Sequence, residues 1–414
     1  MEHGSTSQAA ESTVYWESLE AWTRERIQAF IQALLEEEVT VFLGRRKSER
    51  RLAVDAPPTY RNGYGKPRRL SLTSGTLTLR RPRLRHLEQR FESRILPLFQ
   101  RRTREVGELL PALSLHGLAQ GDFELALRGL LGDGAPLSPS SLQRLRAKWD
   151  ADYEAWRTRD LHDRELVSLW ADGLYVKAGL EKEKAALLIV IGALRDGTKE
   201  ILAVESGARE STEAWKAVLR SLKIRGLPSP RLTIADGHLG IWGALAEIYP
   251  ESAEQRCWNH KLLNVLDQLP RRIQPGARAL LAQLPYAETR ADCERLKRQV
   301  AARYGRAYPK AVEVLERDWE RMVTFYRFPQ EHWKHLRTTN VVESPFAAVR
   351  LRTDAAKRYK RVANATALIW KVLMVAQSRF RRLNAPELLA EVYHGVSYVD
   401  GRRVSGENTR RVAA

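Results

Sequence analysis

The sequence predicts an α/β protein with a mixed sheet, preceded by a mostly helical basic region. After Glu165, three predicted strands are followed by a helix, a strand, a helix and a short fifth strand, which is typical of strands and helices around one sheet. Arg195-Asp196-Gly197-Thr198 is a good hairpin turn between the second and third strands. The third observation is charge, because 69 Lys and Arg against 50 Asp and Glu leave a net charge of +19. A charge so far from zero favours nucleic acid as a partner.

Composition excludes several classes of protein. With 43% hydrophobic and 8% aromatic residues, the chain is typical of a folded globular protein rather than a disordered chain or a coiled-coil rod. No window approaches the roughly 18 uninterrupted apolar residues that a membrane span needs. The polar N-terminus argues against a secretory signal, and the two cysteines fit a reducing cytosol. We therefore expect a cytoplasmic protein with no membrane partner.

Residues 1–44 are expected to be helical, because apolar side chains recur at intervals of three and four from Ile27 to Leu35. Residues 45–103 follow as a basic tract. Between Arg45 and Arg104 there are 18 basic and 4 acidic residues. This clustering favours a DNA-binding surface, since solubility alone does not require basic residues to gather in one tract.

Within the basic tract, leucines and threonines on both sides of Ser74-Gly75 predict a small hairpin. Pro57-Pro58 and Asn62-Gly63 are expected to interrupt regular structure. Arginine suits the gripping of phosphate because its planar guanidinium offers several donors. The arginines expected to bind DNA here are Arg61, Arg68, Arg69, Arg80, Arg81 and Arg83.

Residues 104–156 are expected to form three short helices. The third has a clear start, with Ser138 as its N-cap and Pro139 at its first position. Arg144 and Arg146 on its early turns are what a helix-turn-helix presents to the major groove of DNA. An ordinary three-helix linker with a solvated face explains the same pattern, so both interpretations stay open.

Residues 157–414 carry the predicted sheet and most of the remaining helices. The five predicted strands are 167–171, 185–194, 200–204, 232–235 and 254–257, and helices are expected at 211–224 and 241–249. Almost pure helix follows from Lys261 to about Tyr326, and an amphipathic helix is predicted at 365–382. We divide this part into 157–261, a helical segment 262–330, a closing segment 331–384, and a C-terminal tail 385–414.

Two aspartates are expected to end apolar strands, and each is followed by glycine. Asp172 ends the first strand and Asp236 the fourth. Open α/β sheets place ligand sites at such strand ends. One Asp-Gly pair is explained by an ordinary turn, but two at matching ends gather negative charge that needs a cation. Hard oxygen ligands favour Mg²⁺ or Mn²⁺ over zinc.

Glu343 is the candidate third carboxylate. Its local pattern also fits a capping box, Asn340-x-x-Glu343, while Ser344-Pro345 competes as the start of the next helix. In either case we expect the carboxylate at a helix start, where negative charge is favoured.

Four motifs surround the candidate site residues. They are Trp170-Ala171-Asp172-Gly173-Leu174-Tyr175-Val176-Lys177, Ala235-Asp236-Gly237-His238, Arg256-Cys257-Trp258-Asn259-His260-Lys261 and Arg337-Thr338-Thr339-Asn340-Val341-Val342-Glu343. Together these motifs resemble one known family, the Mutator-type transposases of bacterial insertion sequences, within the Asp-Asp-Glu recombinase class. Arg61-Asn62-Gly63-Tyr64 and Arg81-Pro82-Arg83 are similar to that family's N-terminal pattern.

The resemblance implies that Asp172, Asp236 and Glu343 are the catalytic, metal-binding triad. Their spacing fits a ribonuclease-H-like catalytic core over 157–261 and 331–384, interrupted by an all-α insertion at 262–330. Two Mg²⁺ or Mn²⁺ ions would support DNA cleavage and strand transfer. Implied partners are terminal inverted repeats, target DNA and further copies of the chain, in a bacterial, nucleoid-associated setting. No phosphate loop of the Walker type occurs, so no nucleotide cofactor is expected.

Cys257-x-x-His260 has the spacing of half a zinc site. No second pair of that kind lies nearby, and Cys293 is isolated in the sequence. The resemblance implies that the pair belongs to the family signature, with packing or DNA contact favoured over metal binding.

Two other functions compete with transposition. One is a structure-selective nuclease on the same core, which would not need a module for recognising element ends. The other is a non-catalytic DNA-binding protein derived from a transposase, against which the intact triad argues.

Overall fold

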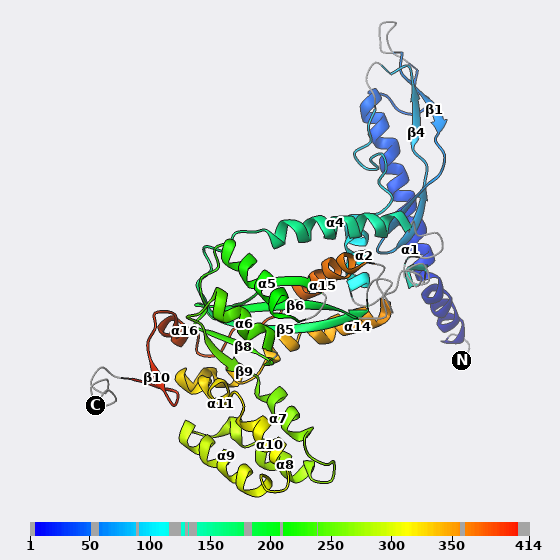
Figure 1. Cartoon of the computed structure of the whole chain (residues 1–414). Helices are drawn as coiled ribbons and strands as arrows, with labels where there is room; N and C mark the ends of the chain where they lie inside the picture. The colour runs from blue at the N-terminus through cyan, green and yellow to red at the C-terminus, as the bar shows by residue number, and fades with distance from the viewer. Residues whose placement is uncertain are drawn as a thin grey trace. The chain divides into compact units, whose positions relative to one another are not determined.

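The computed structural model describes residues 5–50, 58–87, 91–115, 126–128, 131, 139–177, 184–207, 210–237, 239–356 and 361–404 (Figure 1). The chain divides into two compact units, Met1–Leu145 and Arg146–Ala414. Within the described residues, no helix has the length and apolar character that crossing a membrane requires.

A small core in the first unit joins a long helix to a hairpin. Helix α1 (Ser5–Leu43) buries Leu35 against the leucines of strands β2 (Arg68–Leu72) and β3 (Gly75–Leu79). The strands pair antiparallel around Ser74-Gly75, so the predicted hairpin is confirmed. The alternation of buried leucine with exposed polar residues along β3 explains why one face of the hairpin meets α1.

A second pair of strands in the basic tract was missed by the sequence analysis. Strand β1 (Tyr60–Tyr64) pairs antiparallel with β4 (Pro82–Arg85). Asn62-Gly63, expected to interrupt regular structure, lies inside β1 where the register shifts, and Gly63 has a φ of +63°. The glycine therefore forms a bulge rather than a turn.

Two further helices follow, α2 (Arg104–Leu115) and α4 (Pro139–Arg157). Helix α4 begins at Pro139, as expected from the preference of proline for the first turn. Its predicted N-cap Ser138 and the expected helix breaks at 116–117, 121–122 and 132–134 lie outside the described residues. The choice between a helix-turn-helix and a linker therefore stays a prediction.

The second unit contains a mixed sheet of five strands in the order β7-β6-β5-β8-β9. Strand β6 is antiparallel to both of its neighbours, β5 and β7, whereas β8 runs parallel to β5 and β9 runs parallel to β8. All five match predicted strands: β5 (Leu166–Lys177), β6 (Lys184–Leu194), β7 (Lys199–Gly207), β8 (Leu232–Ala235) and β9 (Ala253–Arg256).

The first of these strands is longer than predicted, and this corrects the place of Asp172. Strand β5 continues to Lys177, paired with β6 throughout, so Asp172 lies inside the strand and not at its end. The parallel pairing with β8 stops at Ala171. Asp172 is therefore the first residue of β5 beyond the end of β8.

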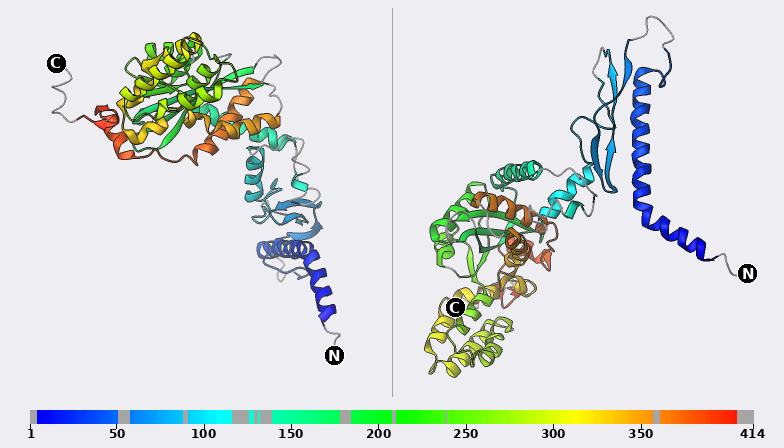
Figure 2. Two further views of the ribbon diagram at one scale, coloured as in Figure 1. Left: turned by 90° about the horizontal axis from the view of Figure 1, so that it is seen from below. Right: turned by 90° about the vertical axis from the view of Figure 1, so that its right-hand side faces the viewer.

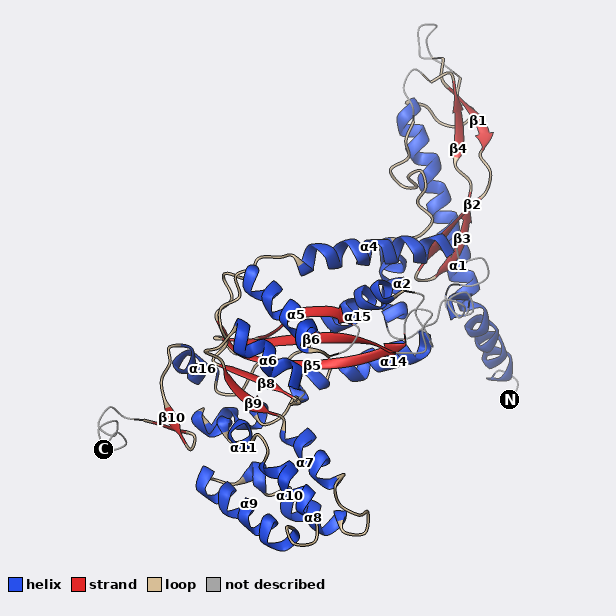
Figure 3. Ribbon diagram, viewed as in Figure 1, coloured by secondary structure: helices blue, strands red, loops and turns tan. Residues whose placement is uncertain are grey.

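Helices cover both faces of the sheet (Figure 3). On one face, α5 (Thr212–Ile224) and α6 (Leu239–Ile248) bury Trp215, Leu222 and Leu245 with Leu169 and Ala171 of β5. Ser211 is the N-cap of α5 and accepts a hydrogen bond from the N–H of Ala214. The other face meets a closing series of helices, which are α12 (Trp333–Leu336), α13 (Asn340–Glu343), α14 (Phe346–Ala356) and α15 (Val362–Gln377).

The sheet is followed along the chain by a helical segment, as predicted (Figure 2). Helix α7 begins at Trp258, whose N–H donates to the carbonyl of Arg337 (2.9 Å), so the start and end of this segment lie together. Its elements are α7 (Trp258–Leu266), α8 (Gln274–Leu281), η1 (Leu284–Tyr286), α9 (Arg290–Tyr304), α10 (Pro309–Glu316), α11 (Trp319–Met322), η2 (Thr324–Arg327) and η3 (Gln330–His332).

Beyond the closing helices, residues of the predicted C-terminal tail are folded. Helix α16 (Pro386–Tyr393) is followed by a short hairpin of β10 (Tyr398–Val399) and β11 (Arg402–Arg403).

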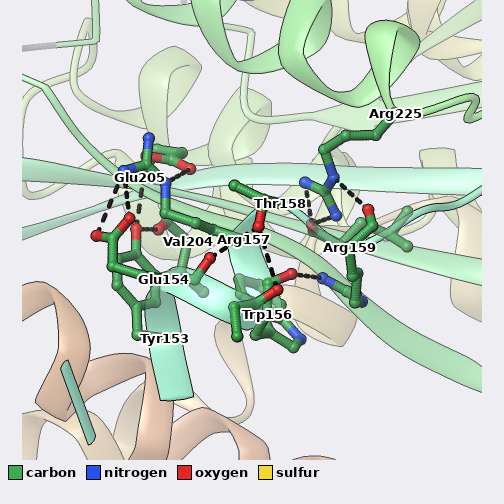
Figure 4. Close-up of polar contacts among 11 residues, drawn as sticks. Tyr153, Glu154, Trp156, Arg157, Thr158, Arg159, Val204, Glu205 and Arg225 are labelled. Carbon is green, nitrogen blue, oxygen red and sulfur yellow. Dashed lines mark hydrogen bonds and ion pairs between the residues drawn. The ribbon is translucent and has the colours of Figure 1, made fainter. Parts of the chain in front are cut away.

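The C-terminal half of α4 is fixed to the edge strand β7 (Figure 4). The Tyr153 hydroxyl donates to the carbonyl of Val204 (2.7 Å). The Arg157 guanidinium lies 3.5 Å from the Glu205 carboxylate. Burial and the Glu205 charge raise the pKa of Tyr153, so this hydroxyl keeps its proton as a donor.

We expect Leu222→Ala to lower the free energy of unfolding by about 2–5 kcal/mol, because Leu222 is fully buried between α5 and the sheet. Ile224 lies two residues later on the same helix and is 77% exposed. Ile224→Ala is the matched control and should change stability by less than about 0.5 kcal/mol. Denaturant unfolding of both variants checks this, and equal losses would contradict the placement of α5.

Candidate active site

Parallel pairing of β5 with β8 places two aspartates next to each other. Ala171 is paired with Ala235, so the next residues, Asp172 and Asp236, occupy adjacent positions. Side chains alternate along a strand, and Ala171 and Ala235 both face α5 and α6. Asp172 therefore faces the other side, as does Trp170, whose indole N–H donates to the carbonyl of His335. The structure thus brings together the two predicted strand-end carboxylates.

The Asp172 carboxylate has the most perturbed environment of the three. Only 9% of the residue is exposed. Burial, followed by the negative charges of Asp236 and Glu343, raises the pKa of Asp172 to about 7. A hydrogen bond from the N–H of Gly173 (2.8 Å) and the nearby His260 act in the opposite direction. The protonated form of Asp172 is thus favoured first by burial and then by the neighbouring carboxylates.

The turn after β8 is held by Arg256 at the end of β9. Gly237 has a φ of +98°, and a Cβ atom there would overlap Nε of Arg256. Glycine is therefore required both by the backbone and by the close approach. The same Nε donates to the carbonyl of Asp236 (3.3 Å), while Nη1 pairs with Asp318 (3.0 Å). Arg256 thus links the Asp236 turn to the helical segment.

Glu343 lies at the end of the short helix α13, not at a helix start. The predicted capping box is wrong, because Thr339 and not Asn340 occupies the N-cap position. The Thr339 hydroxyl donates to the Glu343 carboxylate. Glu343 is 32% exposed, and its charge acts on Asp172. The third predicted carboxylate is therefore close to the first two.

The Cys257 and His260 pair lies beside Glu343. The ligand atoms of Cys257, His260 and Glu343 lie within 4.8 Å of one another. The buried Cys257 sulfur accepts the Thr339 N–H (3.4 Å) and lies 3.3 Å from the Thr339 hydroxyl. In this arrangement the cysteine fixes the residue that holds Glu343.

His260 contributes positive charge to the same place. Its Nδ1 lies 3.8 Å from Oε1 of Glu343. A hydrogen bond with Cys257, aided by the charges of Glu343 and Asp236, raises the pKa of His260 to about 9. The imidazole is therefore protonated at neutral pH, where it offsets part of the carboxylate charge.

The predicted DNA-binding arginines fall into two groups. Arg61 and Arg68 are tied to protein: Arg61 donates to Thr40 of α1 (2.7 Å), and Arg68 to the carbonyl of Gln100 (2.7 Å). These two guanidinium groups stabilise the first unit. The other six are Arg69, Arg80 and Arg83, which are exposed, the half-buried Arg81, and the exposed Arg144 and Arg146 on α4.

Sequence reasoning gave no role to Thr339 or Arg256. Both lie inside the motifs quoted above, and each carries a signal that could have been used. Threonine is a preferred N-cap residue, and here it precedes the carboxylate by four residues. Arginine at the end of a buried strand requires an acceptor, which Asp236 and Asp318 supply.

Comparison with known proteins places these observations in a family. The family model "Transposase, Mutator family" matches residues 2–382. The transposase of insertion sequence element IS6120 from Mycolicibacterium smegmatis is 43% identical over 297 residues, covering 72% of this chain and 92% of that protein. The transposase of IST2 from Acidithiobacillus ferrooxidans is 40% identical over 278 residues, covering 67% and 94%.

A third relative covers more of the chain. The transposase of ISRM5 from Rhizobium meliloti is 33% identical over 356 residues, covering 84% of this chain and 85% of that protein. Among solved structures, the Drosophila P element transposase strand transfer complex aligns over 75% of this chain and 86% of that one, with 11% identity and a TM-score of 0.29. The family match and the three relatives agree, and this chain belongs to the Mutator family of transposases.

Proposed function

We propose that this protein is a DNA transposase that cleaves and joins DNA strands at a site formed by Asp172, Asp236 and Glu343. The observation that carries the proposal is the register of β5 and β8, in which Ala171 and Ala235, the residues immediately before Asp172 and Asp236, are paired. Glu343 adds a third negative charge that acts on Asp172. Membership of the Mutator family supports the same reaction.

The sheet is proposed to be a ribonuclease-H-like core. Three antiparallel strands followed by two parallel ones, with a carboxylate in the first strand and another after the fourth, support this assignment. The helical segment from α7 to η3 separates these carboxylates from Glu343 along the chain, as expected for an insertion.

The donor set fits divalent cations with hard character. Carboxylate oxygens are the ligands that Mg²⁺ and Mn²⁺ prefer. Burial and then the charges of Asp236 and Glu343 raise the pKa of Asp172, and a bound cation would offset both effects. Asp172, Asp236 and Glu343 would hold the ions, two in the proposed arrangement. When bound, such ions supply activation of the attacking water or 3′-hydroxyl and stabilisation of the leaving oxygen.

The remaining side chains orient this cluster. Thr339 holds the Glu343 carboxylate and is itself fixed by Cys257. Protonated His260 reduces the repulsion among the carboxylates, and Arg256 fixes the turn that carries Asp236. Each contact keeps the acidic oxygens in place before DNA enters, which is the requirement for stabilising an in-line displacement.

The first unit and α4 are proposed to bind DNA. The six arginines Arg69, Arg80, Arg81, Arg83, Arg144 and Arg146 would neutralise phosphates, with terminal inverted repeats and target DNA as partners. Several copies of the chain would assemble on the DNA, at the bacterial nucleoid. The basic excess of residues 45–104 supports this surface.

We expect Asp172→Asn, Asp236→Asn and Glu343→Gln each to reduce Mg²⁺-dependent nicking of element-end DNA by at least about a thousandfold, because each removes a charge and keeps the shape. Gel shifts should show unchanged DNA binding. Glu343→Gln should melt within a few degrees of the native protein, since a glutamine oxygen still accepts from Thr339. Native cleavage by any of the three variants would remove that residue from the proposed site.

The raised pKa of Asp172 predicts a pH-dependent cost to stability. The folded state binds this proton more tightly than the unfolded state, whose carboxyl pKa is about 4, so stability falls as pH rises from about 4 through 7. In metal-free protein, Asp172→Asn should therefore gain stability over the native chain between pH 5 and pH 8, by up to about 3 kcal/mol. Unfolding curves at both values test this. Mg²⁺ should stabilise the native chain more than the variant, and a constant difference across pH would contradict the assignment.

Arg83→Ala should weaken DNA binding and reduce the slope of log affinity against log salt by about 0.9 for each phosphate that the protein no longer neutralises. Its melting temperature should not change, because the side chain is exposed. Arg61→Ala is the contrasting variant, and it should mainly lower stability by freeing β1 from α1. Salt titrations of binding with thermal melts separate the two effects. An unchanged salt slope for Arg83→Ala would place the DNA surface elsewhere.

A further inference from the structure

Helix α1 has two apolar faces, and the strands of the first unit cover only one of them. On this inner face, Ile31 and Leu35 pack with leucines of β2 and β3. Gln32 holds the same face, because its amide oxygen accepts the N–H of Arg80 (3.0 Å) and its amide nitrogen donates to the carbonyl of that residue (2.8 Å). The helix turns by about 100° per residue, so the side chains that point away from the strands recur at intervals of three and four.

The outer face of α1 carries large apolar side chains. Trp22, Phe30 and Val41 are 52%, 63% and 77% exposed within the described part of the chain. Polar and small residues lie between them on the same face. The six residues of this outer stripe are Trp22, Arg26, Phe30, Ala33, Glu37 and Val41, all of them exposed. Apolar side chains that gather on one exposed face mark an interaction surface.

The spacing of the outer stripe is the same from either end. Steps of four, four, three, four and four residues connect its members, so the stripe is symmetric about a point between Ile31 and Gln32. A second α1 that runs antiparallel along the stripe therefore places the first member opposite the last, the second opposite the fifth, and the third opposite the fourth. A twofold axis forms each of these pairs twice.

The pairs that this arrangement makes are complementary in size and charge. They are Trp22 with Val41, Arg26 with Glu37, and Phe30 with Ala33. A large apolar side chain thus meets a smaller apolar one at four of the six contacts, and opposite charges meet at the other two. The stripe is complementary to a second copy of itself.

The charges specify the direction of the pair. The Arg26 guanidinium lies over the Trp22 ring, 5.2 Å from its centroid, which keeps the cation on the stripe. Among the residues that the structure describes, Glu37 forms no ion pair. A parallel pair in register would place Arg26 opposite Arg26 and Glu37 opposite Glu37, and like charges repel. Only the antiparallel direction joins each cation to a carboxylate.

We propose that α1 is a dimerisation helix whose outer stripe pairs antiparallel with the outer stripe of a second copy of this chain. For its role the inference rests on the function proposed above, in which several copies assemble on DNA, and it supplies a surface for that assembly. The stripe spans about 30 Å of helix, and a contact of this size is small beside a standard protein interface. We therefore expect a dissociation constant on the order of micromolar in the absence of DNA.

Charge reversal tests the pairing in the full-length protein, free of DNA and metal, by sedimentation equilibrium over a range of concentrations. Arg26→Glu and Glu37→Arg should each weaken self-association by at least about tenfold, because each places like charges opposite one another at two contacts. The double variant restores opposite charges and should associate within about threefold of the native chain. Glu25→Arg is the matched control: Glu25 is exposed on the same helix but off the stripe, and its change should leave association unaltered.

Disulfide trapping tests the direction. A variant with both Trp22→Cys and Val41→Cys should form a covalent dimer on oxidation, since the two positions face each other across the pair. Neither single variant should do so, because the two copies of one position lie about 28 Å apart along the antiparallel helices. The native Cys257 and Cys293 are buried. A covalent dimer from Trp22→Cys alone would show a parallel pair and contradict the proposal.

The outcomes separate this inference from the proposed function. A chain that stays monomeric at every concentration, or one whose association ignores both single charge reversals, overturns the inference even if the native protein nicks DNA. Loss of association in the single variants with recovery in the double variant supports it. Because these measurements need neither DNA nor metal, a native chain that pairs as expected but shows no metal-dependent nicking refutes the proposed function and leaves the pairing in place.

Discussion

The structure of the site depends on the repulsion between two carboxylates that the sheet forces together. Pairing of Ala171 with Ala235 keeps the residues that follow them, Asp172 and Asp236, close together. Burial strengthens this repulsion, because little water remains to screen it. Three neighbouring groups reduce the effect of this repulsion. His260 is protonated, and the N–H of Gly173 donates to the Asp172 carboxylate. Arg256 donates to the backbone carbonyl of Asp236 and so fixes the turn that carries this residue. The fold thus tolerates a local instability that bound cations would relieve.

Glu343, the third carboxylate, is held near the other two by polar contacts of Thr339 and Cys257 rather than by a long helix or strand. Helix α13 has four residues, too few to be stable without tertiary contacts. Its position is set at Thr339, which is buried and bonded to the Cys257 sulfur at the start of α7. The cysteine of the signature therefore connects the end of the sheet to the helix that bears Glu343. The histidine one turn later brings positive charge to the same carboxylate.

Much of the sheet could be predicted because most of its strands contain apolar runs separated by good turns, and local pattern is sufficient for that. The extension of β5 past Asp172 could not, since Gly173 and Tyr175 resemble the end of a strand until β6 is known to accompany them. The pairing of β1 with β4 could not be predicted either, because both strands are polar and β1 contains a glycine bulge that interrupts the strand pattern. Near Glu343, the sequence offered Asn340 and Ser344 as competing N-cap residues. In the structure the N-cap is Thr339, whose tertiary contacts fix the start of the helix. Spatial proximity of the three carboxylates came from family resemblance, because no local signal spans the 107 residues from Asp236 to Glu343.

The hydrogen bond from Trp258 to the carbonyl of Arg337 joins the two ends of the helical segment at its base. The chain leaves the sheet and returns to it at nearly the same point, so the cost of closing this excursion depends only weakly on its length. The helices between these two residues can therefore change in length at little cost in chain closure, as long as Asp318 still pairs with the Arg256 that fixes the Asp236 turn.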